Sequence, residues 1–175
     1  MDWLKQYVIR FGGLKADTHH FDFGIDDMFF EQFEYSEIKK GNIAVHLELV
    51  KDEKVLTFHF FFDGAVIMPC DRCFEPVELK IKGTEQLIVK FGAGYFEEND
   101  ELQIIPEGVN HFDISPFLYE YCHLLLPVRR IHPDDENGNS LCDPEVIKLL
   151  EQSSGASDPD PRWDVLNKLK NNSQS

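Results

Sequence analysis

The Cys70-Asp71-Arg72-Cys73 segment places two thiols at a spacing that can close on one soft metal ion or form a redox-active pair. A tetrahedral zinc ion requires two further ligands. His132 and Cys142 offer them, because they flank an acidic loop that contains glycine and asparagine. We therefore predict a zinc site formed by Cys70, Cys73, His132 and Cys142. Reduced thiols without a metal, and thiol–disulfide chemistry at the cysteine pair, remain alternatives.

The other polar residues form no recognisable catalytic group. The remaining histidines lack the spacing of a catalytic triad or of a metalloprotease helix. Gly92-Ala93-Gly94 lacks the third glycine and the strand-turn-helix setting of a dinucleotide-binding loop. The acidic residues 134–136 do not follow the ligand order of an EF-hand, which favours a solvated loop. We expect a protein that is not an enzyme and has no small-molecule substrate.

Composition predicts a folded chain with an acidic surface. The 175 residues include 15 phenylalanines and are 42% hydrophobic, enough for a buried core. No apolar run approaches the roughly 20 residues of a membrane span, and no secretion signal is recognisable, so we expect a cytoplasmic protein with reduced cysteines and no membrane partner. The net charge of −15 opposes nonspecific binding to phosphates. Any RNA contact must therefore be local, and the acidic surface is more naturally a partner for a basic protein. A surface charge that serves only solubility is the alternative.

The centre of the chain has the pattern of an antiparallel sheet. Apolar residues alternate with other residues from Ile43 to Leu49, and a return strand covers residues 55–62. Gly64 predicts a bulge or bend, and the cysteine turn follows at the end of this strand. Further strands are expected over residues 77–82 and 87–91. These successive strands without helical crossovers predict an α+β fold with a curved antiparallel sheet or a partly closed β-barrel, and a few short helices mainly in the C-terminal third.

The N-terminal third offers weaker signals. Residues 6–11 and 20–23 read as extended segments around a Gly12-Gly13 turn. Residues 26–33 fit either a short helix or a continued strand or loop. Residues 92–111 read as a loop with one short strand near Leu102.

Three proline-marked helix starts follow. Ser115-Pro116 is expected to begin a helix, with Ser115 as its cap and an apolar stripe of Phe117, Tyr121, Leu124 and Leu125. Leu118 and Cys122 lie one residue off that stripe, and Cys122 is expected to be a buried small apolar residue. Asp143-Pro144 is expected to begin a helix that extends to Leu150, and Asp160-Pro161 one that carries Trp163, Leu166 and Leu169. We therefore expect a single domain over residues 1–150, a flexible linker over 151–160, and a C-terminal helix and tail over 161–175.

The order of these motifs resembles the YceD-like family of large ribosomal RNA subunit accumulation proteins. The resemblance extends from about residue 20 to 170, and the segments that carry it are Gly64 through Cys73, Asp113-Ile114 with Glu120 and Leu125 through Val128, His132, Cys142, and Asp160 through Trp163 with Leu166 and Leu169. Many relatives carry a second cysteine pair where this chain has Leu141-Cys142-Asp143, so His132 takes the place of one thiol. The resemblance implies a role in the accumulation of 23S ribosomal RNA.

The resulting hypothesis is a noncatalytic factor that supports large ribosomal subunit biogenesis by binding ribosomal RNA or a basic ribosomal protein. Guanidinium groups bind phosphate bidentately, and the C-terminal helix can dock on a partner. The candidate partner-binding residues are Arg72, Arg129, Arg130, Arg162, Trp163, Leu166 and Leu169. The alternatives are a thiol–disulfide or zinc-dependent enzyme that uses Cys70 and Cys73, and a general protein–protein adaptor.

Overall fold

The structure is a computed structural model that describes residues 3–99 and 102–154. The chain divides into two compact units, Met1–His132 and Pro133–Ser175. The first unit contains all the named strands and the helices η1, α1 and α2, and the second contains α3.

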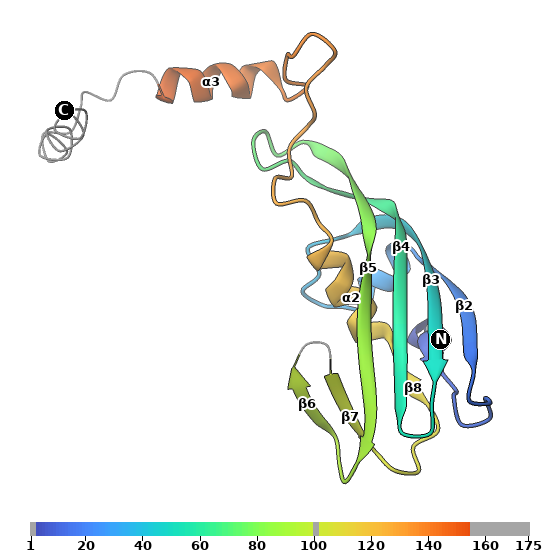
Figure 1. Ribbon diagram of the computed structural model, residues 1–175. Coiled ribbons are helices and arrows are strands. Elements are labelled where there is room, and N and C mark those ends of the chain that lie inside the picture. Colours follow the sequence, from blue (N-terminus) through green and yellow to red (C-terminus); the bar gives the residue numbers. More distant parts are fainter. Residues whose placement is uncertain (1–2, 100–101, 155–175) are drawn as a thin grey trace, which may run out of the picture. The chain divides into compact units, whose positions relative to one another are not determined.

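A six-stranded sheet forms the frame of the first unit (Figure 1). Its order is β2-β3-β4-β5-β7-β6. The strands are β2 (Thr18–Ile25), β3 (Lys40–Lys51), β4 (Val55–Pro69), β5 (Pro76–Gly92), β6 (Phe96–Asn99) and β7 (Leu102–Pro106). The predicted antiparallel arrangement is confirmed for β2 through β5.

Two parts of the predicted sheet are wrong. The sheet is mixed, because β7 pairs with β5 in the parallel direction. Strand β6, which the sequence did not indicate, pairs antiparallel with β7, so the chain reverses twice and inserts β7 between β5 and β6. The sheet is also open within the described residues, with β2 and β6 at its edges, so it forms no closed barrel. Short strands with irregular alternation carry too little signal to fix such pairings.

The core lies on the sheet face predicted from the alternation. The side chains of Ile43, Val45, Leu47 and Leu49 in β3 are at most 1% exposed, and Phe58 and Phe60 of β4 are fully buried.

The expected bulge at Gly64 is absent, because the strand register is continuous on both sides of this residue, where Gly64 pairs with Ile43 of β3 and with Ile81 of β5. Glycine is required there for another reason. A Cβ atom on Gly64 would lie 2.3 Å from the Asn42 carbonyl oxygen and 2.5 Å from the Ile43 Cα.

The N-terminal segment is less extended than expected. Residues Trp3–Tyr7 form the 3-10 helix η1, followed by the short strand β1 (Val8–Ile9), which pairs with β8 (Phe112–Asp113). Helix α1 (Asp27–Glu31) follows Asp26, which is its N-cap residue. The Asp26 carboxylate accepts a hydrogen bond from the Phe29 N–H, and aspartate is one of the residues favoured at this position.

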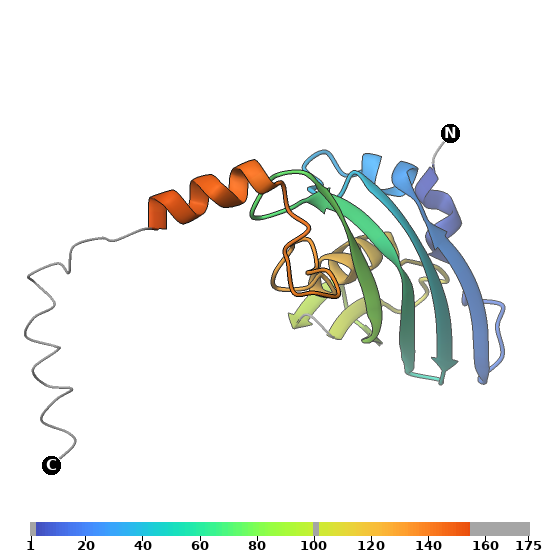
Figure 2. The same cartoon turned by 90° about the horizontal axis from the view of Figure 1, so that it is seen from above.

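Helix α2 (Ser115–Leu124) packs against the inner face of the sheet, where the Tyr121 ring lies 5.5 Å from the Phe60 ring. Figure 2 shows the sheet curving around this helix. The predicted start of this helix at Ser115 is confirmed, but the Ser115 side chain does not cap it. Instead, the Asp113 carboxylate accepts a hydrogen bond from the Ser115 N–H. The predicted stripe is also shifted. Leu118, Tyr121 and Cys122 are buried, whereas Leu124 is 63% exposed, because the face is set by the sheet it covers.

The second unit is described from Pro133 to Ser154. A loop closed by an isolated bridge between Asp134 and Ser140 leads into α3 (Pro144–Ser154). The predicted start is confirmed, since the Asp143 carboxylate accepts from the Glu145 N–H at 2.8 Å. The helix continues through residues 151–154, which we expected to open the linker; the helix expected after Asp160 lies outside the described residues. None of the described helices is long and apolar enough to span a membrane.

Candidate metal centre

The two cysteines of the predicted pair lie in a tight turn between β4 and β5. The Cys70 N–H donates to the Glu75 carbonyl and the Phe74 N–H donates to the Cys70 carbonyl, both at 2.9 Å. Pro69 and Pro76 are paired at the ends of the two strands. Phe74 adopts a left-handed backbone with φ of 62°, which closes the turn directly after Cys73. The sequence predicted this location at the end of β4 correctly.

The turn favours the thiolate form of Cys70. Burial by itself raises the pKa of this thiol, but backbone N–H groups of Cys73 and Arg72, with further hydrogen bonds from His132, outweigh burial and lower the pKa to about 6. One of these donors is the Arg72 N–H, at 3.4 Å from the sulfur. A thiolate is the form that binds a metal, and it is also the nucleophilic form in thiol exchange.

His132 is oriented as a ligand of this turn. Its Nδ1 lies 3.5 Å from the Cys73 sulfur, and its Nε2 lies 3.1 Å from the Pro76 carbonyl oxygen. A carbonyl only accepts, so Nε2 carries the proton and Nδ1 presents its lone pair toward Cys73. Metal-bound histidines are commonly held by such a bond from the second ring nitrogen. Around tetrahedral zinc, a sulfur and a nitrogen ligand are about 3.5 Å apart, which the observed distance matches.

The segment before His132 is attached to the cysteine turn. Arg130 pairs with Asp71, the residue after Cys70, and its guanidinium also lies 3.1 Å from the Glu37 carboxylate. These contacts hold His132 beside the turn, although 59 residues separate it from Cys73 in sequence. Arg130, which we expected to contact a partner, therefore has a positioning contact in this structure.

Cys142 is the fourth predicted ligand. Its side chain is 4% exposed, and its N–H donates to the Ser140 hydroxyl at 3.2 Å. One ligand atom from each of Cys70, Cys73, His132 and Cys142 lies within 4.8 Å of every other, so the four residues lie close together and could bind a metal. Three thiolates and one imidazole suit zinc in a structural site.

The other residues singled out from the sequence are not part of the candidate metal centre. Arg129 is exposed and Arg72 is half-buried. Cys122 is fully buried in α2, as predicted, and burial raises the pKa of its thiol to about 12. The C-terminal candidates Arg162, Trp163, Leu166 and Leu169 lie outside the described residues.

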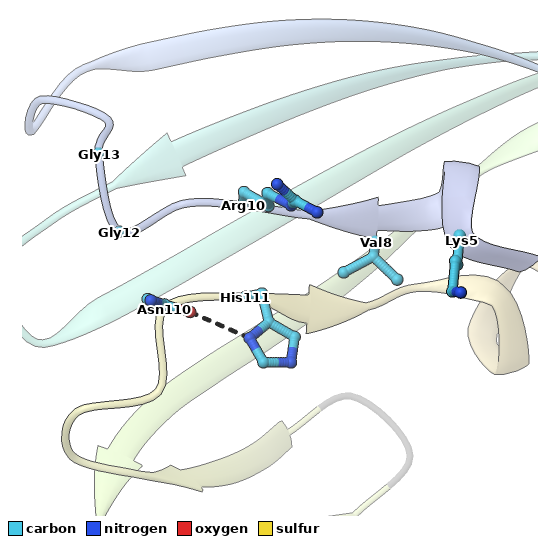
Figure 3. A pocket seen from close by; sticks show the side chains of 7 residues that line it. All are labelled: Lys5, Val8, Arg10, Gly12, Gly13, Asn110 and His111. Atoms are coloured by element: carbon cyan, nitrogen blue, oxygen red, sulfur yellow. Dashed lines mark hydrogen bonds between the residues drawn. The ribbon is translucent and has the colours of Figure 1, made fainter.

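One feature of the structure was missed from the sequence. A cavity lined by Lys5, Arg10 and His111 lies along the paired strands β1 and β8 (Figure 3). No motif marks it, because Lys5 and Arg10 lie near the N-terminus of the first unit, whereas His111 comes from a distant segment of the chain.

A family model described as "Large ribosomal RNA subunit accumulation protein YceD" matches residues 58–170, well over half of the chain. The chain belongs to the YceD family. The match includes all four residues of the candidate metal centre and begins within β4. The expected resemblance began near residue 20, whereas the match begins at residue 58. Strands β1, β2 and β3 of this YceD family member therefore precede the matched region. Neither a curated protein nor a solved structure matches the chain.

Proposed function

We propose that this YceD family member is a noncatalytic factor that supports biogenesis of the large ribosomal subunit and accumulation of 23S rRNA in the cytoplasm. The observation that carries the proposal is the family match over residues 58–170, whose description names large ribosomal RNA subunit accumulation and no reaction. The site geometry agrees with a structural role, because the four grouped donors include three buried thiols.

In this proposal the metal centre is a zinc scaffold. Cys70, Cys73, His132 and Cys142 hold one zinc ion, which closes the β4–β5 turn onto the segment after α2. Structural zinc sites have four protein ligands and leave no position for a substrate, whereas catalytic sites keep one open. A fully protein-ligated ion therefore stabilises a surface and does not supply a reaction centre.

The partner is large-subunit ribosomal RNA or a basic ribosomal protein. Arg72 and Arg129 can contact phosphates, and Arg162 is proposed for the same role. Trp163, Leu166 and Leu169 are proposed as an apolar docking segment after a linker, since tryptophan is a frequent anchor of interfaces. The acidic surface, with a net charge of −15, suits a basic protein.

Depletion of the protein from its cells tests the role. The expected result is a reduced level of 23S rRNA and of large-subunit particles in a sucrose gradient, restored by the wild-type chain and not by a Cys70→Ser/Cys73→Ser variant. A Cys122→Ala variant is the matched control, because it removes a buried thiol that is not part of the donor set. Unchanged particle profiles after depletion would rule out the proposed role.

A second candidate function is thiol–disulfide exchange, favoured by the lowered pKa of Cys70. The attacking sulfur must also be accessible, and Cys70 and Cys73 are only 0% and 6% exposed. Reduction of insulin by the purified protein would support exchange. Bound zinc with protected thiols would support the scaffold.

A further inference from the structure

Strand β2 is the outer strand of the sheet within the residues that the structure describes, with β3 as its neighbour (Figure 1). Edge strands of natural proteins are commonly protected by proline, lysine, a bulge or a short length, because their outward main-chain groups can pair with another strand. The eight residues of β2, THHFDFGI, include neither proline nor lysine, and the register with β3 is continuous from Thr18↔Val50 to Ile25↔Ile43. This strand therefore has the features of one that accepts a further strand.

The even-numbered residues of β2 direct their main-chain groups toward this edge. The Lys51 N–H donates to the Asp17 carbonyl at 3.0 Å, which continues the register of Thr18 with Val50 by one pair. Opposed residues of antiparallel strands alternate between pairs that exchange both hydrogen bonds and pairs that exchange none. Residues 17, 19, 21 and 23 therefore bond to β3, whereas residues 18, 20, 22 and 24 face outward.

Outward main-chain groups at the two ends of β2 already have partners. The Thr18 N–H donates to the carboxylate of the preceding aspartate at 2.8 Å, and the Gly24 carbonyl accepts from the Tyr7 hydroxyl at 2.7 Å. Both contacts agree with the alternation, since both residues are even-numbered. Within the described chain, the outward N–H and C=O groups of His20 and Asp22 lie between these ends and are available to another strand.

The side chains of β2 carry complementary chemistry on each face. On the outer face His20 and Asp22 are exposed, and the Asp22 carboxylate accepts from the His46 Nδ1 at 2.7 Å. A carboxylate has further acceptor sites, and an imidazole N–H of His20 can donate whether the ring is neutral or charged. On the core face Phe21 and Phe23 are half-buried, with their rings stacked at 6.4 Å. The strand thus presents a donor, an acceptor and apolar rings along its outward side.

A second copy of β2 fits this edge in one register better than in the neighbouring ones. The copies pair antiparallel around a two-fold axis, and their core faces lie on the same side when residues of the same face are opposed. With the axis at Phe21, each His20 lies opposite Asp22 of the second copy, and the two Phe21 rings lie opposite each other. The adjacent allowed registers place His20 opposite His20, or Asp22 opposite Asp22, where like charges repel. The register centred on Phe21 also joins the outward main-chain groups of His20 and Asp22, and each such pair exchanges two hydrogen bonds.

We propose that two copies of this chain associate through β2, antiparallel and centred on Phe21, and that their sheets become one continuous sheet. Addition of a strand at a sheet edge takes its affinity from main-chain hydrogen bonds and its specificity from alternate side chains. Here the specificity comes from the two symmetry-related pairs of His20 with Asp22 and from the Phe21 rings, which shield each other from water. The net charge of −15 on each copy opposes association at long range, and salt of about 0.15 M screens this repulsion beyond about 8 Å. Such a dimer neither requires nor excludes the proposed role in ribosome biogenesis.

Sedimentation equilibrium of the full chain tests the association, in reducing buffer with about 0.15 M salt and at concentrations from about 1 to 200 µM. The mass should rise with concentration from that of one chain to that of two. His20→Asp should raise the dimer dissociation constant by about 10-fold, because it places two carboxylates opposite each other at both symmetry-related positions. The double variant His20→Asp/Asp22→His exchanges the two side chains and should recover most of this loss.

His111→Asp is the matched control, since it adds the same charge at an exposed position outside β2. A single-chain mass at every concentration, an equal loss of association in the control, or no recovery in the double variant would each overturn the proposal.

Disulfide cross-linking tests the register independently of charge. The Cα atoms at position 21 of the two copies are expected to lie about 4.5 Å apart, which a disulfide can span, so Phe21→Cys should form a linked dimer under mild oxidation. Phe23→Cys removes another half-buried phenylalanine of β2, but its two copies would lie about 14 Å apart and should not link. Mass spectrometry of the linked peptides identifies the joined positions, and similar melting temperatures establish that both variants are folded. Equal linking at positions 21 and 23, or none at position 21, would overturn the proposal.

Discussion

Asp71 and Arg130 bind each other through both main chain and side chain. The Asp71 N–H donates to the Arg130 carbonyl at 2.7 Å, and the Arg130 N–H donates to the Asp71 carboxylate at 3.0 Å. The guanidinium Nε lies 3.2 Å from the other carboxylate oxygen. Because Asp71 lies between Cys70 and Cys73, and Arg130 lies two residues before His132, this pair fixes the separation of three of the proposed ligands.

Replacing Asp71 should therefore weaken metal binding without removing a ligand. Asp71→Ala is expected to lower zinc affinity by about 10- to 100-fold, the range found when groups that orient metal ligands are removed. Competition with a chromophoric chelator measures the affinity. Glu78→Ala is the control, since it removes an exposed carboxylate of the neighbouring strand. Equal affinities of the two variants would contradict the positioning role.

The ligand assignment predicts about one zinc ion per chain. Single replacements Cys70→Ser, Cys73→Ser, His132→Ala and Cys142→Ser should each reduce the bound zinc measured by mass spectrometry of the metal, and a strong chelator should lower the melting temperature of the wild type. Cys122→Ala should lose stability, because Cys122 is fully buried, and still retain its zinc. Full zinc content in the His132 or Cys142 variants would exclude those residues as ligands.

The left-handed Phe74 predicts a stabilising substitution. Its φ of 62° costs about 1–2 kcal/mol for a residue with a Cβ, and its side chain is 80% exposed. Glycine adopts this backbone conformation without strain, but it increases the conformational entropy of the unfolded chain, which lowers the free energy of unfolding by about 0.4–1 kcal/mol. Phe74→Gly should therefore raise the free energy of unfolding by about 0.5–1 kcal/mol in urea titrations. Phe74→Ala retains the strain and should show no gain; a gain of the same size in alanine would disprove this explanation.

Two glycines of the sheet should respond very differently to alanine. At Gly64 the added Cβ meets backbone atoms of Asn42 and Ile43 within 2.5 Å, so the strands must separate. At Gly83 the nearest atom, at 2.3 Å, is the end of the Leu125 side chain, which can rotate. We expect Gly64→Ala to cost about 2–3 kcal/mol of unfolding free energy and Gly83→Ala less than about 1 kcal/mol. Chemical denaturation of both variants measures these losses. Similar losses of unfolding free energy at Gly64 and Gly83 would contradict the explanation by backbone contact.

Tyr7 predicts a loss of stability at alkaline pH. Burial, with a smaller contribution from Asp26, raises its pKa from 10.0 to about 12, and its hydroxyl donates to the Gly24 carbonyl. The folded state thus favours the neutral phenol, so this contribution is complete below pH 10 and is lost as the pH rises through 12. Cys122 acts in the same direction, so a Cys122→Ala background is needed.

In that background, the difference in unfolding free energy between the parent and Tyr7→Phe should shrink between pH 10 and 12. Urea titrations at several pH values measure this difference. A constant difference over this range would show that Tyr7 ionises equally in the folded and unfolded chains.

Local patterns in the sequence were enough for the long strands and for one half of the metal centre. The alternation from Ile43 to Leu49 places one face in the core, because strand side chains alternate regardless of what the strand pairs with. Cys70 and Cys73 are joined by a turn of adjacent residues, so their spacing alone brought them together. The starts of α2 and α3 were equally local, since proline and acidic caps act on the first helical turn.

Only the tertiary structure decided which distant residues meet. The parallel β5–β7 pairing, the orientation of His132 by Pro76 and the pairing of β1 with β8 all depend on contacts between segments that are not adjacent in the chain. Likewise, Gly64 is needed for a close approach of backbones and not for a bulge. The physical reason is that periodicity encodes the face on which a side chain lies, whereas a partner is selected by packing and hydrogen bonding across the whole fold.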